Sequence, residues 1–424
     1  MPTTEETVPN LSSLSHHNGT RSQQVPGAPA AAPPAATWSA SDLQGRAIAF
    51  ASLRYSTEAF MDYRIPGCAP KQNYALIGSG VSQSPKQPVS LREKHGFQVG
   101  GVMMPAGVIN PPHMHFTAEV FICTQGEWTF NWGFNPDHHS ARLSPGDICS
   151  VPTWIYRGFQ NIGEKEDGFM FTALGGDDTG GILWAPQTLA AAAKEGVHLT
   201  DDYQIIDAHL GQQWDSATMR RLEPMEQAEI DRLRQFTPAE MASRVVRFAD
   251  LQWSSSALLD ASLPGRGGQI APVIGLGISE DRNALAPIYN AHGFSVEWLK
   301  IPSGGSVSMH QLAERQVLTC YQGSVEISVS NMPQSQQETA QAAIKMIVNG
   351  TPTAWDTYAM PALVWRSYAN TGKSEAVLLM MTPNDARKRI TWSPEVVTAA
   401  AENGLAMDAN GYVALKKFTD RSQR

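Results

Sequence analysis

Two histidines and a glutamate lie close together in the stretch GVINPPHMHFTAEVFICTQG, which runs from residue 107 to residue 126. On a β-strand, residues i and i+2 point to the same face, so His113 and His115 would project together. Glu119 has the same parity if the strand resumes after a local turn. Two imidazoles and one carboxylate form the set that binds non-haem Fe(II) and leaves coordination positions open. If the two histidines merely packed in a core, the buried imidazoles and carboxylate would need other partners, so the spacing favours a metal site.

The elements that must carry these residues are predicted to be strands. Short apolar segments such as FQVGGVMMPAG, AEVFICTQGEWTFNWG and GFMFTALGG recur at roughly ten-residue spacing and are broken by Gly, Pro, Asn and Asp. This pattern indicates an antiparallel barrel or sandwich. Helices are expected in APQTLAAAAKEG and SPEVVTAAAENG, which start near a proline and stop at a glycine. A helical connector is expected over residues 223–247.

The chain also carries an internal duplication. When the sequence is shifted by 197 residues, HGFQV at His95 meets HGFSV at His292, and His113 meets His310. Further along, PTWIYRGFQNIG meets PALVWRSYANTG, and ILWAPQTLAAAAKEG meets ITWSPEVVTAAAENG, at slightly larger shifts. A repeat of this length is a domain rather than a solenoid unit. We therefore expect one domain over residues 37–222, the connector over 223–247, and a second domain over 248–424.

Composition narrows the classes of function. The net charge is −8 and the basic residues do not cluster, which argues against nucleic acid and anionic membranes as partners. No stretch reaches the ~18 apolar residues that a membrane span needs. None of the four cysteines forms a CxxC pair, so neither a zinc ribbon nor a disulfide scaffold is indicated. The chain is expected to be cytoplasmic, with a disordered segment over residues 1–36 and with a homo-oligomer left open.

These residues resemble the two sequence motifs of the cupin family. The first motif is matched by Gly107, His113, His115, Glu119 and Gly126, and the second by Gly146, Pro152 and Asn161. With the duplication, residues from about 75 to 415 resemble a bicupin, and the metal-dependent cupin dioxygenases in particular. The resemblance implies an all-β fold of two tandem cupin barrels, also called double-stranded β-helices or jelly rolls, with a few peripheral helices.

Arg157 departs from the family pattern, because cupins often supply a histidine there as a fourth metal ligand. A guanidinium stays protonated and does not normally bind metal, so three protein ligands are predicted. Arg157 could clamp a substrate anion with its planar fork, or it could form a structural ion pair with a carboxylate such as Asp147. The sequence leaves both roles open.

The second copy is predicted to have lost the metal site. His310 remains there, but Leu312 replaces the second histidine and Gln316 replaces the glutamate. Arg366 stands at the place that matches Arg157. The second barrel would then serve as a scaffold or an interface, or bind something without metal.

The preferred hypothesis is an Fe(II)-dependent oxygenase that acts in the first barrel on a small organic acid or aromatic compound, with O₂ as co-substrate and Arg157 facing a substrate anion. An alternative is a bicupin decarboxylase, lyase or isomerase that uses Mn(II) or another metal, in which Tyr156 moves a proton. A third is a cupin that binds a small molecule without catalysis. Five aromatic residues either wall a pocket or pack in the core: Phe121, Trp128, Trp132, Tyr156 and Phe159.

Overall fold

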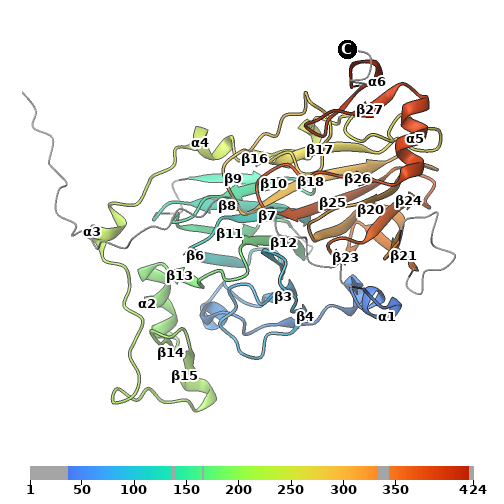
Figure 1. Ribbon diagram of the computed structural model, residues 1–424. Helices are drawn as coiled ribbons and strands as arrows, with labels where there is room; N and C mark the ends of the chain where they lie inside the picture. The colour runs from blue at the N-terminus through green and yellow to red at the C-terminus, as the bar shows by residue number, and fades with distance from the viewer. Residues whose placement is uncertain (1–36, 136–138, 165–166, 333–342, 420–424) are drawn as a thin grey trace, which may run out of the picture. The chain divides into compact units, whose positions relative to one another are not determined.

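The computed structural model describes residues 37–135, 139–164, 167–332 and 343–419 (Figure 1). The segment 1–36, for which disorder was expected, lies outside the described residues. Strands predominate in the described chain and its helices are few and short. The prediction of an all-β fold with peripheral helices is confirmed.

The first barrel is built from two sheets. One sheet runs in the order β16 (Val245–Val246), β10 (Ile148–Val151), β7 (Glu119–Gln125), β12 (Gly168–Gly175), β5 (Phe97–Met104), β3 (Gln72–Ile77) and β2 (Tyr55–Ser56), with β4 (Val89–Leu91) beside β3. The other runs in the order β13 (Ile182–Trp184), β6 (Ile109–His115), β11 (Arg157–Asn161), β8 (Trp128–Trp132) and β9 (Ser140–Leu143). Met104 and Phe121 from the first sheet pack with Phe130 from the second in one buried cluster.

The second barrel repeats this arrangement. Its strands run in the order β17 (Gln269–Ile274), β18 (Phe294–Ile301), β25 (Ala376–Pro383), β20 (Gln316–Ser330), β24 (Trp365–Asn370), β19 (Ser306–Gln311) and β26 (Thr391–Trp392). Four further strands pair at its margin: β1 (Ala47–Ile48), β21 (Ala343–Thr351), β22 (Ala354–Trp355) and β23 (Thr357–Met360). The pairing of β5 with β12, from Phe97 opposite Gly175, recurs as the pairing of β18 with β25, from Phe294 opposite Pro383.

Helices lie outside the sheets, and the two longest have matching places in the two halves. α2 (Pro186–Lys194) and α5 (Pro394–Glu402) each have a proline in the first turn, and a glycine follows each one closely, as the sequence predicted. Each is followed by a small hairpin, formed by β14 (Val197–Leu199) and β15 (Ile205–Asp207) or by β27 (Leu405–Met407) and β28 (Val413–Leu415). The remaining short helices are α1 (Ala40–Gln44), α3 (Gln227–Ile230), α4 (Pro238–Ala242), α6 (Lys416–Thr419) and the 3₁₀ turns η1 (Phe50–Ser52), η2 (Met61–Arg64), η4 (Ala208–Leu210) and η5 (Phe248–Asp250). None of the helices in the described ranges combines the length and the apolar character of a membrane span.

Two short segments cross between the halves. β1, near the start of the described chain, pairs with β23, and the Tyr358 hydroxyl donates to the carbonyl of Leu43 at 2.9 Å. In the other direction, β16 follows α4 in the predicted connector and pairs with β10 of the first barrel. Residues 223–247 therefore hold two short helices and an edge strand. The domain boundaries at 37, 222 and 248 stay a prediction.

Candidate metal centre

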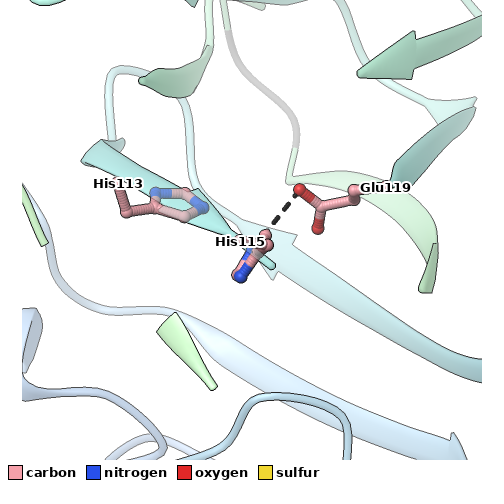
Figure 2. A group of neighbouring side chains, drawn as sticks. All are labelled: His113, His115 and Glu119. Atoms are coloured by element: carbon pink, nitrogen blue, oxygen red, sulfur yellow. Dashed lines mark ion pairs between the residues drawn. The ribbon is translucent and has the colours of Figure 1, made fainter. Parts of the chain in front are cut away.

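The structure brings His113, His115 and Glu119 together inside the first barrel (Figure 2). The two histidines end β6, and Glu119 begins β7 after a short turn. One ligand atom from each of the three residues lies within 4.8 Å of the others, and all three side chains are buried. Strand alternation sets the two imidazoles on one face, and the turn returns the carboxylate to them.

A β-bulge adds a fourth polar residue to this face. Across the ladder, His113 is opposite Arg157, but Asn110 is opposite Phe159, so three steps on β6 match two steps on β11. The extra residue falls within the pair Pro111–Pro112, and a bulge of this kind reverses the alternation. Asn110 and His113 therefore face the same side despite their odd separation. Gly158 lies against the bulge, where an added Cβ would stand 2.6 Å from the carbonyl oxygen of Asn110.

Backbone carbonyls fix which nitrogen of each imidazole carries its proton. Nδ1 of His113 lies 2.8 Å from the Pro111 oxygen, and Nδ1 of His115 lies 3.2 Å from the Gly181 oxygen. A carbonyl only accepts, so each Nδ1 carries the hydrogen and each Nε2 keeps its lone pair. This is the tautomer in which a histidine binds metal through Nε2.

The three residues fit a bound cation on this geometry. Nε2 of His115 faces Oε2 of Glu119 at 3.5 Å. Both atoms carry lone pairs, so a positive ion held by both of them relieves their repulsion. Burial lowers the pKa of both imidazoles well below the usual range, and the charge of Arg157 acts in the same direction. Neutral histidines are the form that coordinates metal.

Arg157 forms a buried ion pair with Glu119. Its Nε and Nη2 donate to the same oxygen, Oε2, at 3.2 and 3.1 Å, and its Nη1 donates to the carbonyl of Ile155 at 3.2 Å. The guanidinium is fully buried. Burial raises the pKa of Glu119, and the ion pair with Arg157 opposes that shift. The ion-pair role left open by the sequence is the one seen, but its partner is not Asp147, which pairs with Arg247 at 2.6 Å.

Tyr156 lies away from the ligand set. Neighbouring residues of an extended chain point to opposite faces, so Arg157 turns inward and Tyr156 outward. The Tyr156 hydroxyl contacts the sulfur of Met225 at 3.9 Å, and the ring packs near Phe134 and Ile230. Burial raises its pKa to about 12. The structure therefore gives no path by which Tyr156 could move a proton at the candidate site.

A cavity of about 80 Å³ opens onto His113, His115 and Glu119. Its wall is largely apolar, with polar groups at a few places. The other lining residues that matter here are Phe60, Tyr74, Gln98, Gly100, Asn110, Phe159, Thr172, Leu174, Ile182 and Trp184. A larger surface hollow of about 900 Å³ shares Ser79, Gly80, Val81, Ser82, Gln87 and Ile182 with this cavity, so the cavity lies directly behind it.

Of the five aromatic residues singled out in the sequence, Phe159 lines the cavity, whereas Phe121, Trp128 and Trp132 belong to the core. Trp184 and Asn110 line the cavity and were missed. The pair Pro111–Pro112 inside a strand was the available signal for Asn110, because proline in a strand marks a bulge or an edge. Trp184 follows the barrel in sequence and comes to His113 only by the pairing of β13 with β6.

Among the described residues, the matching place in the second barrel lacks the ligand set. His310 keeps the same tautomer, since its Nδ1 lies 2.8 Å from the Ser308 oxygen, but Leu312 and Gln316 cannot complete a metal site. Glu297 stands where the first barrel has Gly100. Its buried side chain reaches the segment at Gly277 and Ile278, and its Oε1 accepts from the Ile278 amide at 3.3 Å. That segment matches the cavity-lining residues Gly80 and Val81.

One protein family and several solved structures are similar to this chain. Residues 84–194 match the sequence profile of a family described as cupin. A comparison with curated proteins found no match. Among solved structures, an oxalate decarboxylase from Lactobacillus farciminis in complex with formate is similar with a TM-score of 0.49 and 13% identity, over 83% of this chain and 89% of that chain.

Two further solved structures resemble the chain to a similar degree. An oxalate decarboxylase from Bacillus subtilis at pH 4.6 has a TM-score of 0.47 and 12% identity, over 89% of this chain and 85% of that one. A vicilin from tomato, Solanum lycopersicum, has a TM-score of 0.47 and 13% identity, over 82% of this chain and 87% of that one. With the family match and the repeated barrel, the chain resembles a bicupin, as the sequence motifs predicted.

Proposed function

We propose that the first barrel is the metal centre of an enzyme that cleaves a small organic acid, as a decarboxylase or another lyase. The observation that carries the proposal is the buried group of two Nε2 lone pairs and one carboxylate at the wall of a small cavity. His113, His115 and Glu119 would hold a divalent ion such as Mn(II) or Fe(II). When bound, that ion supplies a Lewis acid that polarises an oxygen of the substrate.

Charge supports an acid as the substrate. Two buried cations, Arg157 and Lys71, lie near the ligands, and two buried carboxylates, Glu119 and Asp62, pair with them. These four charges cancel. A divalent ion would therefore leave the site with an excess of positive charge in a poorly solvated place, which favours an anionic ligand.

Size supports a small acid that needs no second substrate beside it. A cavity of about 80 Å³ holds only a few water molecules, because each needs at least ~10–15 Å³ by this measure. A compact carboxylate fits such a space more readily than an aromatic compound does. The apolar walls of Phe60, Leu174 and Trp184 keep bulk water away from the bound acid.

The oxygenase is retained as a second candidate because of one feature. With Arg157 in place of a fourth ligand, three protein ligands would leave positions on a bound ion open for an acid and O₂ together. The two candidates share the metal and the acid and differ in whether O₂ is consumed.

A substrate screen tests the proposal. The protein, loaded with Mn(II) or Fe(II), is incubated with small mono- and dicarboxylic acids while dissolved oxygen and reaction products are followed together. Cleavage without stoichiometric oxygen uptake is the expected result. Oxygen uptake in proportion to product would show that the protein is an oxygenase and not a lyase. Binding of acids with no turnover by either ion would leave a non-catalytic binding protein.

A further inference from the structure

We infer that Asn110 donates a hydrogen bond to a carboxylate oxygen of the substrate, and that Lys71 is the positioning residue that orients its amide. The inference rests on the proposed function, because it concerns the same cavity. It adds the protein group that recognises the acid, which neither the ligand set nor Arg157 provides. Asn110 lines the cavity and is only 7% exposed.

Lys71 is buried next to Asn110. Its Nζ binds Oδ2 of Asp62 in a buried ion pair, and it donates to Oδ1 of Asn110 at 2.8 Å. Neither Lys71 nor Asp62 lines the cavity. Burying both charges is costly unless they are paired and hydrogen-bonded. Here the ion pair of Lys71 and Asp62 is completed by a hydrogen bond from Lys71 to the side-chain amide of Asn110.

This contact decides which end of the amide faces the site. An ammonium only donates, so the end of Asn110 that meets Lys71 must be the oxygen. The nitrogen then turns toward His113, where Nδ2 lies 3.3 Å from Nδ1. Nδ1 has already given its hydrogen to the Pro111 oxygen at 2.8 Å and cannot accept. Among the described residues, the Asn110 amide hydrogens thus have no acceptor.

A buried donor without an acceptor is costly, so a ligand oxygen in the cavity would be held there. The nearby ammonium also polarises the amide and strengthens its N–H groups as donors. The position beside His113 places this donor next to the ligand set. The substrate class is therefore a small carboxylate that puts an oxygen within reach of Asn110 while it lies against the metal ligands.

The second barrel gives an internal comparison. Val307 stands at the place of Asn110, and Gly268 stands at the place of Lys71. The bulge itself is retained there, since Val307 is opposite Tyr368 and His310 is opposite Arg366. The copy that lacks the metal ligands therefore lacks the amide and the lysine as well, although the backbone that would present them remains.

The test measures acetate binding to the Mn(II)-loaded full-length protein by calorimetry, with manganese content measured for every sample. Asn110→Leu is expected to weaken acetate binding by about 10- to 100-fold, the range for losing a hydrogen bond to a charged group, with one manganese retained. Asn131→Leu is the matched control, because it makes the same exchange on β8 of the same barrel, outside the cavity lining. It should leave the affinity within about twofold. Equal affinity of Asn110→Leu and the wild type, or an equal loss in Asn131→Leu, would overturn the inference.

A double-mutant cycle tests the role of Lys71. Lys71→Met alone would leave the Asp62 carboxylate unpaired and could unfold the protein, so the pair Asp62→Asn, Lys71→Met removes both charges together. In the wild-type background this pair should weaken acetate binding, and in the Asn110→Leu background it should add nothing. Additive losses would show that Lys71 does not act through Asn110. A wild-type protein that binds manganese but no acetate would instead contradict the proposed function itself.

Discussion

At the scale of single residues, Arg157 is the feature that most distinguishes this site from the four-ligand pattern. The sequence left it between a substrate clamp and a structural ion pair, and its donors prove to be committed to Glu119 and Ile155. In the proposed metal site, Arg157 is a positioning residue for Glu119. In the absence of metal, it is also the cation that stabilises the buried Glu119 carboxylate.

A variant separates these two roles. Arg157→Met leaves Glu119 buried without a counter-ion, which typically costs about 3–5 kcal/mol. A bound divalent ion restores a positive charge, so Mn(II) should raise the melting temperature of the variant by more than it raises that of the wild type. Thermal unfolding of both proteins, with and without Mn(II), measures this. If the destabilisation is equal with and without the metal, Arg157 acts through packing alone.

His310 gives a prediction for pH. Burial lowers its pKa from 6.5 to about 3. The unfolded chain takes up a proton below pH 6.5 and the folded chain does not until about pH 3. The stability contributed by neutral His310 is therefore full above pH 6.5 and falls as the pH drops toward 3, by about 1.4 kcal/mol per pH unit.

The contribution of His310 is measured by comparing the wild type with His310→Asn at two pH values. Between pH 7.5 and pH 5, metal-free wild type should lose about 2 kcal/mol more of its free energy of unfolding than His310→Asn loses. Denaturant unfolding at both pH values measures the two losses. The other buried histidines titrate in both proteins and cancel in the comparison. Equal losses would mean that His310 is not held neutral by burial.

At the scale of elements, one position of a matching strand pair differs at the cavity wall. Gly100 on β5 lines the cavity, whereas Glu297 stands at the matching place on β18 and its side chain reaches Ile278. An added Cβ at Gly100 would lie 3.0 Å from the Tyr74 oxygen and 3.1 Å from Oγ1 of Thr172. The metal ligands come from β6 and β7 and do not depend on β5.

Gly100→Val should therefore separate ligand binding from metal binding. The valine side chain would take up space that the acid needs. If this crowding costs roughly 1–3 kcal/mol, as overpacking of a packed site does, acetate affinity should fall by about 5- to 150-fold. Manganese content, measured on the same samples, should stay unchanged. Glu297→Gly, the reverse change in the second barrel, serves as the control and should alter neither quantity. If Gly100→Val lost its metal, the metal site on β6 and β7 would depend on the cavity wall formed by β5.

The positions of the strands explain which residues of the site could be predicted from the sequence. Strand alternation predicted that His113 and His115 share a face, and the motif spacing indicated Glu119, because these residues are neighbours along the chain. Asn110 is three residues before His113, so simple alternation would put it on the opposite face. The bulge at Pro111–Pro112 brings it to the same face. Lys71 and Trp184 reach the site through strand pairings and packing between distant segments, which a single sequence does not specify. Tyr156 was a candidate for moving a proton, but it neighbours Arg157 in sequence, and alternation along an extended chain turns such neighbours apart.

At the scale of the whole molecule, the duplication has produced two barrels with different contents. The first has a ligand set, an open cavity and an amide donor. The second keeps the bulge, one histidine and the buried Arg366, with Glu297 in place of Gly100. Each barrel also receives an edge strand from outside its predicted boundaries, since β1 pairs with β23 and β16 pairs with β10. These pairings join the two halves of the chain.

The most direct test of the central claim is the metal content of the full-length protein, measured by elemental analysis after purification without added metal and after loading with Mn(II). We expect one equivalent of a divalent transition metal per chain, held by His113, His115 and Glu119. His115→Ala should lose this metal while its circular dichroism spectrum stays that of a folded β protein, and His310→Ala, which removes the matching histidine of the second barrel, should keep it. Two equivalents per chain, or a folded His115→Ala that retains its metal, would contradict a single metal site at these three residues.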